Sequence, residues 1–568
     1  MIENIPRRYD RVFFRRFFKL LRPFWVSSEK WVAISLLIIV IAFTILQVVT
    51  RVELNLFYKT FYDALQNFDT KAIIHALGRF LILAIFYITF ASFGLYATGV
   101  LNNRWRRFLT FQYLGQWFQD DRFYRMPVLG LQVDNPDQRI SEDLDTFPSM
   151  TLALFVSFLN GGLTLISFGY ILWTLSGQLI IPFLHHHLVI DGYLFWVSLA
   201  YAVGGTYITM KIGRFLPWLN YQQQHFNANF RYNLVRTREF SEQIALYRGN
   251  TTEIKHLHTN FSRIFSNYLS IIGTELRLNL FLNGYALVSN IIGVCASLPM
   301  YLKRKIQLGT VMQVARAFEE VNGAMSLIMT SYTSIATWYA VIYRLSEFKD
   351  RMHETSVALK SSPLKVHTMA ENGNLHLEHV TVGLPNRRIL IKDLDLQIKK
   401  QERLLVMGRS GCGKSTLFRT IGGIWPYAKG EIILPSLNKM MFLPQKPYFP
   451  LGTLKQALCY PFEADYIEDK KVIEILKECG LDYLEERLFQ LASWEQELSW
   501  GEQQLVAIGR VLLHKPEWLF LDEATSALDD ESEKLIFSLL AKHLPHLTLV
   551  SVGHRKSLIP YHYEKIVL

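Results

Sequence analysis

The sequence predicts two folds in series, an α-helical transmembrane domain with six spans followed by an α/β domain built around a phosphate-binding loop. Three observations support this division. Of the 568 residues, 50% are hydrophobic and only 19% are charged, which departs from the composition of soluble domains. Long charge-free windows fill the first 345 residues. A glycine-rich loop then follows an apolar strand at residues 404–407.

The helical half is predicted from windows long enough to cross a bilayer. A spanning helix needs about 20 apolar residues, because no water satisfies free backbone groups inside the membrane. Six such windows have no charge in their interiors, and they lie at 30–51, 79–104, 147–184, 191–211, 277–303 and 320–344. The third also has room for an outer turn. We expect six spans, with no carboxylate inside them to relay protons.

Basic residues set the orientation of these spans. They are Arg7, Arg8, Arg11, Arg15, Arg16, Lys19 and Arg22 before the first window, and Arg104, Arg106 and Arg107 after the second. By the positive-inside bias, both chain ends lie in the cytosol, although the outer triplet 303–305 runs against this rule. The net charge of +11 therefore gathers between apolar spans, so a nucleic acid partner is not expected.

The expected domain boundaries follow from these changes in composition. Residues 1–30 form a cytoplasmic N-terminal segment and 31–345 the transmembrane domain. Residues 346–370 form a polar linker, and 371–568 form the α/β nucleotide-binding domain. The polar stretches 102–150 and 211–275 are too long for tight turns, so we expect them to extend the helices into the cytosol.

A phosphate-binding loop opens the α/β domain. Its residues are Gly408, Arg409, Ser410, Gly411, Cys412, Gly413, Lys414, Ser415 and Thr416, between an apolar strand and a helix. In this context the backbone N–H groups surround phosphate oxygens, Lys414 reaches the β and γ phosphates, and Ser415 ligates Mg²⁺. An ordinary strand-to-helix turn would not need this full pattern. ATP and Mg²⁺ are therefore the expected cofactors.

Two carboxylates end a second apolar strand about 100 residues downstream of the loop. Asp522 and Glu523 follow Trp518-Leu-Phe-Leu521. Such a pair is more often a solvated strand end, but after a phosphate loop it suits Asp522 for the metal shell and Glu523 for polarising the attacking water.

The stretch Leu498-Ser-Trp-Gly-Glu-Gln-Gln504 resembles the signature of ABC transporters. The resemblance implies an ABC exporter-like fold in which Ser499, Gly501 and Glu502 close on ATP held by a second subunit. It further implies that Gln445 is catalytic and senses the metal, that Asp529 belongs to the loop after the carboxylates, and that His554 is the switch histidine. A lone histidine would more often be structural. The order of the motifs favours the catalytic reading for His554, together with Glu523, Lys414 and Gln445.

Two positions depart from this family pattern. Leu384 occupies the place of the aromatic residue that stacks on adenine, and Trp500 replaces the first glycine of the signature pair. Neither change removes a catalytic group, so hydrolysis is still expected.

The membrane half resembles a narrower group of the same family. The matching segments are 134–143, 55–65, 242–249 and 309–318, and in the second half Gly452-Thr-Leu454 and Trp494. They are similar to SbmA/BacA-type bacterial peptide transporters and to ABC subfamily D, and most of all to the YddA-like branch, in which the permease is fused to its ATPase. Without this resemblance, 134–143 would be a helix-capping turn with a solvated acidic face.

The resemblance implies an ATP hydrolase coupled to transport, working as a homodimer by alternating access in a bacterial inner membrane. The lipid bilayer and a transported solute are the further partners, and the nucleotide-binding domain lies in the cytosol. The expected solutes are peptides or other amphipathic or bulky hydrophilic molecules such as cobalamin, with fatty acyl compounds as the alternative. An ATP-gated channel or regulator is a third hypothesis, while a soluble ABC ATPase of the DNA-repair or translation type would lack the spans. The sequence determines neither the solute, nor the direction of transport, nor the residues that contact the solute.

Overall fold

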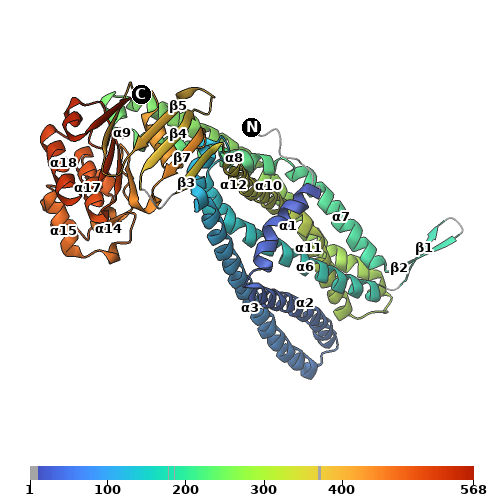
Figure 1. The fold of residues 1–568 in the computed structure, drawn as a ribbon. Helices are drawn as coiled ribbons and strands as arrows, with labels where there is room; N and C mark the ends of the chain where they lie inside the picture. Colours follow the sequence, from blue (N-terminus) through green and yellow to red (C-terminus); the bar gives the residue numbers. More distant parts are fainter. Residues whose placement is uncertain (1–10, 177, 184–185, 369–372) are drawn as a thin grey trace. The chain divides into compact units, whose positions relative to one another are not determined.

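The chain forms two compact units, one helical and one α/β. The structure, a computed structural model, describes residues 11–176, 178–183, 186–368 and 373–568. The helical unit comprises Met1–Leu114 and Asn135–Phe348, and the α/β unit comprises Gly115–Asp134 and Lys349–Leu568 (Figure 1). A helical domain followed by an α/β domain is the expected fold class, which is confirmed. Of the predicted N-terminal segment 1–30, residues 1–10 lie outside the described residues.

Helices of very different lengths make up the helical unit. They are α1 (Arg11–Trp25), α2 (Lys30–Gln66), α3 (Thr70–Phe118), α5 (Pro136–Gln138), α6 (Leu144–Leu175), α7 (Tyr193–Gly213), α8 (Leu216–Glu239), α9 (Ser241–Leu246), α10 (Asn250–Leu302), α11 (Leu308–Thr330) and α12 (Tyr332–Lys360). Among the described residues, four helical stretches are long and apolar enough to cross a membrane: 30–66, 70–128, 136–175 and 250–302. A total of six spans remains a prediction.

Several helices continue beyond the charge-free windows. Arg51 lies inside α2, and Glu320 lies well inside α11. Arg51 Nη1 donates to Glu320 Oε2 at 3.0 Å, so the two charges compensate each other within the helical unit. Helices α2 and α11 therefore continue past the charges that bound the predicted spans, because paired charges do not stop a helix. Where the spans themselves end stays a prediction.

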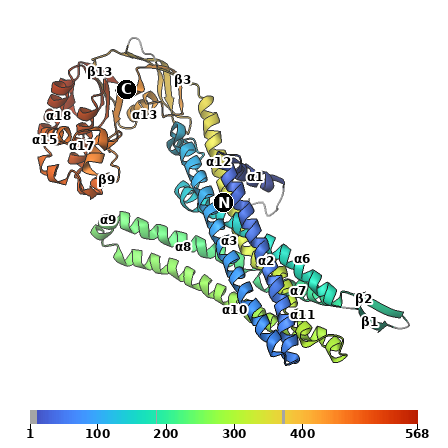
Figure 2. The same ribbon diagram turned by 90° about the horizontal axis from the view of Figure 1, so that it is seen from below.

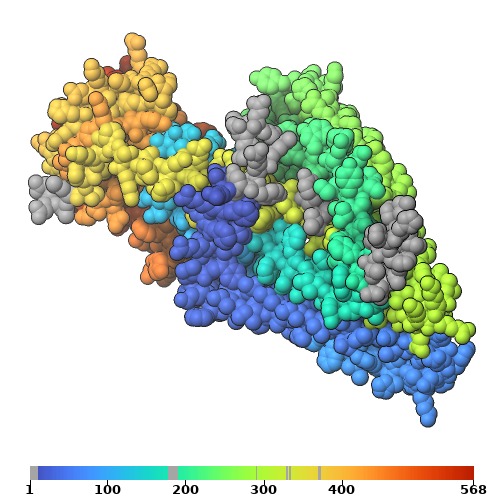
Figure 3. Space-filling view, turned by 90° about the vertical axis from the view of Figure 1, so that its right-hand side faces the viewer, coloured from blue at the N-terminus to red at the C-terminus, as the bar shows by residue number. Residues whose placement is uncertain are grey.

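The helical unit has three further features. Helices α8 and α10 run side by side and are joined through α9 (Figure 2), which confirms that the polar stretch 211–275 continues as helix. Strands β1 (Gln178–Phe183) and β2 (His186–Asp191) pair as an antiparallel hairpin where an outer turn was expected. On one face, α6 packs between the N-terminal helices and α7 (Figure 3).

The α/β unit holds two main sheets. Its strands are β3 (Leu364–Thr368), β4 (Leu375–Gly383), β5 (Ile389–Ile398), β6 (Arg403–Met407), β7 (Ala428–Leu434), β8 (Met440–Leu443), β9 (Gly452–Thr453), β10 (Leu491–Ala492), β11 (Trp518–Asp522), β12 (Thr548–Val552) and β13 (Glu564–Val567). A parallel sheet has the order β13-β6-β12-β11-β8, and a mixed sheet has the order β3-β7-β4-β5. Two-stranded β9–β10 is separate.

Helices cover the parallel sheet. They are α13 (Lys414–Ile421), α14 (Leu454–Cys459), α15 (Asp469–Glu478), α16 (Trp494–Glu497), α17 (Trp500–His514) and α18 (Asp530–His543). Strands β11 and β12 are almost wholly buried, as continuous apolar strands in parallel sheets are. Because β6, β11 and β12 are parallel neighbours, their carboxyl ends meet at one edge. This edge carries the loop at Gly408, the Asp522–Glu523 pair and the segment leading to His554.

Candidate functional site

The phosphate-binding loop joins β6 to α13, and its shape depends on glycine. Gly411 and Gly413 have φ angles of +80° and +110°, which favour glycine. A Cβ on Gly413 would also lie 3.0 Å from the side chain of Leu390. Residues 414–421 then form α13, so the loop ends at a helix N-terminus, where backbone N–H groups can bind anions.

The lysine of this loop is buried and lies against the loop itself. Lys414 is 5% exposed, and its Nζ donates to the carbonyl oxygens of Gly408 at 2.9 Å and Arg409 at 3.2 Å. Its Nζ also lies 3.0 Å from Nε2 of His554. The ammonium group is thus held at the mouth of the loop, where phosphate oxygens can take the place of the carbonyls.

The expected metal ligands lie in contact with each other. Ser415 Oγ donates to Asp522 Oδ1 at 2.9 Å. Burial raises the pKa of Asp522; the hydrogen bond from Ser415 opposes this rise, and the neighbouring Glu523 carboxylate adds to it. A hydroxyl and one carboxylate fit Mg²⁺, which prefers oxygen ligands and keeps several waters. The third expected ligand, Gln445, instead donates from Nε2 to Glu523 Oε2 at 3.3 Å.

Glu523 is held in an unusual backbone conformation at the end of β11. Its φ is +51°, a left-handed value that is uncommon outside glycine, and its N–H donates to the carbonyl of Val552 at 3.1 Å. Its Oε1 lies 3.1 Å from Nε2 of His554. The same His554 nitrogen therefore faces both the ammonium of Lys414 and the carboxylate of Glu523. Its protonation decides whether it accepts a hydrogen bond from the lysine or donates one to the glutamate.

The signature segment caps a helix. Ser499 is the N-cap of α17; its N–H and Oγ donate to Glu502 Oε2 at 2.7 and 2.8 Å, and its Oγ accepts from the Glu502 N–H. Burial works to raise the pKa of Glu502, but hydrogen bonds from Tyr483 and Ser499 outweigh it and hold that pKa below its ordinary value. Burial and the Glu502 carboxylate raise the pKa of Tyr483 to about 12. Trp500 follows the cap and is 56% exposed.

The structure does not bring every expected ATP contact to the phosphate loop. The Asp529 carboxylate caps α18 by accepting from the N–H of Ser532 at 3.1 Å, and hydrogen bonds from Ser532 lower the pKa of Asp529. Among the described residues, no hydrogen bond connects Ser499 or Gly501 with residues 408–416. Gly501 has open surroundings, since a Cβ there would meet its nearest neighbour, Leu528, at 3.6 Å.

Two residues that the sequence analysis did not single out connect these motifs. Gln504 accepts from the N–H of Ala527 at 3.1 Å and donates to the carbonyl of Gln445 at 3.5 Å. Arg555 donates to the carbonyls of Leu528 and Ser526, both at 2.7 Å. Gln504 is 2% exposed, and Gln503 and Arg510 of the same helix are buried as well. Buried polar side chains usually have hydrogen-bond partners, so polar residues among the apolar ones of α17 are the signal that sequence reasoning could have used.

Leu384 follows the last residue of β4. Its N–H donates to the carbonyl of Arg388 at 2.9 Å, and its side chain packs against the hydrophobic core of the unit. The indole of Trp425 donates to the carbonyl of Gly383 at 2.9 Å. This position therefore offers an aliphatic rather than an aromatic surface to a bound base.

Residues 115–134, which fall inside the predicted transmembrane domain 31–345, pack with the α/β unit. They include a short turn, Gln119–Asp121, and helix α4 (Arg122–Val128). Arg125 Nη2 donates to the carbonyl of Gly423 at 3.0 Å, and the Tyr427 hydroxyl donates to the carbonyl of Val128 at 3.0 Å. This segment includes the last residues of α3 (Thr70–Phe118), so the α/β unit takes in part of the chain that lies between helices of the helical unit in sequence.

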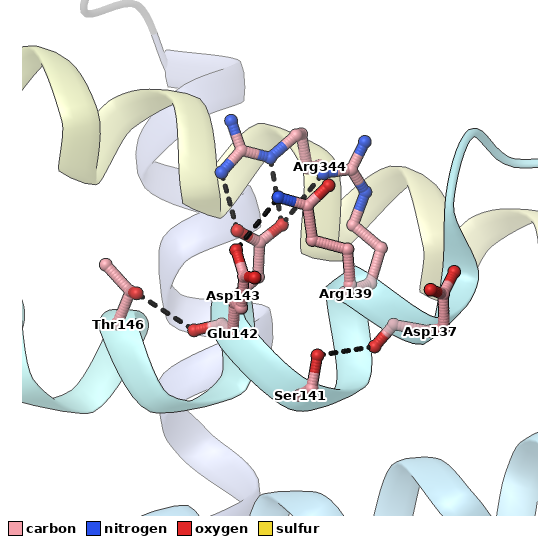
Figure 4. Close-up of polar contacts among 8 residues, drawn as sticks. Asp137, Arg139, Ser141, Glu142, Asp143, Thr146 and Arg344 are labelled. Atoms are coloured by element: carbon pink, nitrogen blue, oxygen red, sulfur yellow. Dashed lines mark hydrogen bonds and ion pairs between the residues drawn. The ribbon is translucent and has the colours of Figure 1, made fainter. Parts of the chain in front are cut away.

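The acidic motif at 134–143 forms a buried ionic cluster in the helical unit. Asp143 is 4% exposed and ends a π-helical turn, Arg139–Asp143. Its carboxylate accepts from Nε and Nη2 of Arg344 at 2.9 and 2.5 Å, and from Nη1 of Arg139 at 3.1 Å (Figure 4). The paired geometry with Arg344 is the bidentate form that guanidinium groups favour. It connects the start of α6 with α12.

Comparison with known proteins agrees with this architecture. Residues 20–302 match the family described as ABC transporter transmembrane region 2, and residues 391–526 match the family described as ABC transporter. The inner membrane ABC transporter ATP-binding protein YddA of Escherichia coli is 30% identical, over 96% of this chain and 96% of its own length. The lysosomal cobalamin transporter ABCD4 of Homo sapiens is 26% identical, over 98% and 94%. A solved bacterial Atm1-family ABC exporter with ATP bound has a TM-score of 0.73 at 17% identity, covering 94% of each chain.

Proposed function

Because the chain belongs to the family of ABC transporters, we propose that it is a half-transporter that works as a homodimer. ATP drives the movement of peptides, or of other amphipathic or bulky hydrophilic solutes such as cobalamin, across a bacterial inner membrane. Two nucleotide-binding domains lie in the cytosol, and each ATP is held between the phosphate loop of one subunit and the signature of the other.

One observation carries this proposal. Lys414 and Glu523 both contact Nε2 of His554, at the edge where the phosphate loop and β11 end. A binding protein needs only the loop, whereas hydrolysis also needs a carboxylate beside the γ phosphate and a group that responds to it. The three residues are therefore assigned to catalysis, and Gln445, which contacts Glu523, is assigned with them.

The remaining residues of the site take binding roles in this proposal. The loop from Gly408 to Thr416 holds the phosphates, and Ser415 and Asp522 hold Mg²⁺ with Gln445 in reach. Mg²⁺ would neutralise the charge that develops on the phosphates. Glu523 orients water, while Lys414 positions the terminal phosphate.

The homodimer is supported by the signature segment, which forms no hydrogen bond with the phosphate loop of its own chain among the described residues. Ser499 and Gly501 have no hydrogen bond to the phosphate loop among the described residues, and Trp500 is exposed beside them. Tryptophan is one of the residue types that are enriched at protein–protein interfaces. A second copy would supply both the ATP and the surface that covers Trp500.

The test uses the full chain in proteoliposomes with ATP added to one side. Radiolabelled peptides, cyanocobalamin and palmitoyl-CoA are followed separately in wild type and in Glu523→Gln. We expect ATP-dependent movement of a peptide or of cyanocobalamin, and its loss in Glu523→Gln. Glu531→Gln is the matched control, since Glu531 lies in the exposed first turn of α18.

Three results would contradict the proposal. Undiminished transport in Glu523→Gln would remove the role of hydrolysis. Movement of palmitoyl-CoA alone would support the fatty-acyl alternative. Passive flux that opens on ATP binding in both variants would indicate an ATP-gated channel.

A further inference from the structure

The helical unit contains a cavity of 660 Å³ between α2, α3, α6 and α11. Two ion pairs contribute to its wall, Arg51 with Glu320 and Arg316 with Glu319. We propose that this cavity is the solute site and that it binds zwitterionic, peptide-like molecules. This inference rests on the proposed transport function and narrows its solute class.

Part of the cavity wall belongs to a helix that is long and apolar enough to cross a membrane. Asn160 is on its wall and near the middle of α6, about 24 Å from the start of that helix at about 1.5 Å per residue. α6 belongs to one of the stretches long and apolar enough to cross a membrane. Polar and charged groups inside a membrane-spanning bundle are costly, so they mark solute or ion pathways by default.

The first ion pair is a rigid part of this wall. Arg51 donates from Nη1 to Glu320 at 3.0 Å and from Nη2 to Thr164 at 3.1 Å, and Nη2 also contacts Asn160. Asn160 in turn donates to Gln47 at 3.3 Å. These contacts tie α2, α6 and α11 together around the guanidinium. Arg51 is therefore preorganised, and Glu320, whose side chain is 32% exposed, stays accessible.

The second ion pair is exposed and exchangeable. Arg316 and Glu319 lie on one turn of α11, 2.8 Å apart, and their side chains are 52% and 51% exposed. An exposed pair of this kind contributes little to stability, so opening it costs little. A solute with both a carboxylate and an ammonium group can replace each half: its carboxylate meets Arg316 and its ammonium meets Glu319. The wall remains electrically balanced after the exchange.

This balance argues against a polyanionic solute. Both arginines of the wall already face a carboxylate, so their positive charge is compensated before any solute enters. A coenzyme A thioester would bring several phosphate charges towards Glu319 and Glu320, and like-charge contacts at close range select against such ligands. A bare fatty acid is disfavoured as well, because its apolar chain would have to lie against the two ion pairs.

Aromatic side chains complete the site. Tyr58, Phe80, Tyr87 and Phe168 also line the cavity, and the Arg316 guanidinium lies 4.9 Å from the ring centre of Tyr58. Aromatic walls with a few polar groups are typical of small-molecule sites. They accept apolar and aromatic peptide side chains, while the ion pairs hold the charged ends.

The test measures binding without nucleotide, by equilibrium dialysis of the full chain in lipid nanodiscs. The probes are radiolabelled alanyl-phenylalanyl-alanine with free ends, the same tripeptide with acetylated and amidated ends, palmitoyl-CoA and cyanocobalamin. The free tripeptide is expected to bind about tenfold more tightly than its blocked form, as the loss of two charged contacts predicts.

Two variants test the wall itself. Glu319→Gln leaves Arg316 unpaired, so we expect about tenfold weaker binding of the free tripeptide and tighter binding of a tripeptide acetylated only at its amino end. Arg316→Gln should favour the form amidated only at its carboxyl end. Glu53→Gln is the control, because Glu53 lies on α2 in a separate ion pair with Arg79 and does not line the cavity.

Several outcomes would overturn the inference. They are equal binding of the free and blocked tripeptides, tighter binding of palmitoyl-CoA or cyanocobalamin than of the free tripeptide, and equal tripeptide affinities of Glu319→Gln and Glu53→Gln. Failure here is distinct from failure of the proposed function. Tripeptide binding without ATP-driven transport would contradict only the transport function. Peptide transport with unchanged binding in Glu319→Gln would contradict only this assignment of the site.

Discussion

The carboxylate of Asp143 accepts two hydrogen bonds from the guanidinium of Arg344, which joins the start of α6 to α12 (Figure 4). The chain runs directly from residues 115–134, which pack with the α/β unit, into the motif that ends at Asp143. α12 leaves the helical unit after Phe348 and continues to Lys360. The cluster thus holds together two segments that both lead to the ATPase.

Asp143→Asn is expected to destabilise the helical unit by about 3 kcal/mol, because it leaves buried Arg139 and partly exposed Arg344 beside a neutral amide. The midpoint of thermal unfolding in detergent measures this loss. Glu142→Gln is the control, since Glu142 is an exposed neighbour whose carboxylate bonds only to Gln138 among the hydrogen bonds described. Equal midpoints for the two variants would contradict the stabilising role of the cluster.

The composite sites of the proposed homodimer predict a difference between cis and trans combinations of two substitutions. A heterodimer of a Lys414→Ala chain with a Gly501→Asp chain retains one intact site, so we expect up to half of the wild-type hydrolysis. Both substitutions in one chain, paired with a wild-type chain, leave no intact site. Phosphate release from doubly tagged, purified heterodimers measures the difference.

Gly501→Asp suits this experiment because its Cβ has space within its own chain, with the nearest contacts at 3.6 and 3.7 Å. The substitution is therefore expected to disturb the partner rather than the fold. Equal hydrolysis by the cis and trans heterodimers would argue against sites shared between subunits.

Asp522→Asn is expected to stabilise the nucleotide-free protein while abolishing Mg²⁺-dependent hydrolysis. Burial raises the pKa of Asp522 in the folded state, so the folded state binds the proton more tightly than the unfolded state does. Above the pKa of Asp522 in the folded state, its ionised carboxylate therefore lowers the free energy of unfolding. This loss of stability disappears as the pH falls below the pKa that Asp522 has in the unfolded chain. Unfolding midpoints near neutral pH should rise in Asp522→Asn.

The difference in midpoint between Asp522→Asn and wild type should shrink in acid. Active sites often hold groups in environments that destabilise the folded protein, so a substitution that abolishes activity can raise the free energy of unfolding. A lower midpoint for Asp522→Asn at neutral pH would show that burial of Asp522 is compensated by contacts that asparagine cannot make.

Arg125→Ala is expected to lower transport several-fold more than ATP hydrolysis. It removes the hydrogen bond to the carbonyl of Gly423 and leaves that from Tyr427 to Val128. The number of solute molecules moved per ATP hydrolysed is the measurement. Arg106→Ala is the control, because Arg106 lies on α3 within the helical unit, in an ion pair with Asp145. An unchanged ratio would show that α4 carries no coupling through Arg125.

Much of the site could be predicted because its parts are local. Three parts of the site each lie within one short segment: the loop at Gly408–Ser415, the strand that ends in Asp522, and the cap at Ser499. Within such a segment, spacing and residue type are enough to predict the chemistry. Links such as Gln504 to Gln445 and Arg555 to Leu528 could not be predicted, because they join segments far apart in the chain and a single glutamine or arginine has no distinctive local pattern.

The ends of the helices could not be predicted from the sequence either. Charge placement predicts spans that end at Arg51 and Glu320, yet both residues lie inside helices, because they form an ion pair with each other across the bundle. Local hydropathy counts both as costly, whereas pairing removes much of that cost.

By itself, the sequence determined a helical membrane half, an α/β half and the chemistry of ATP, since apolar runs and glycine-rich loops act through near neighbours. Only the tertiary structure decided that residues 115–134 pack with the α/β unit, that Asp143 meets Arg344, and that charges from α2 and α11 line one cavity. These relationships depend on distances between remote segments, and such distances follow from packing rather than from local pattern.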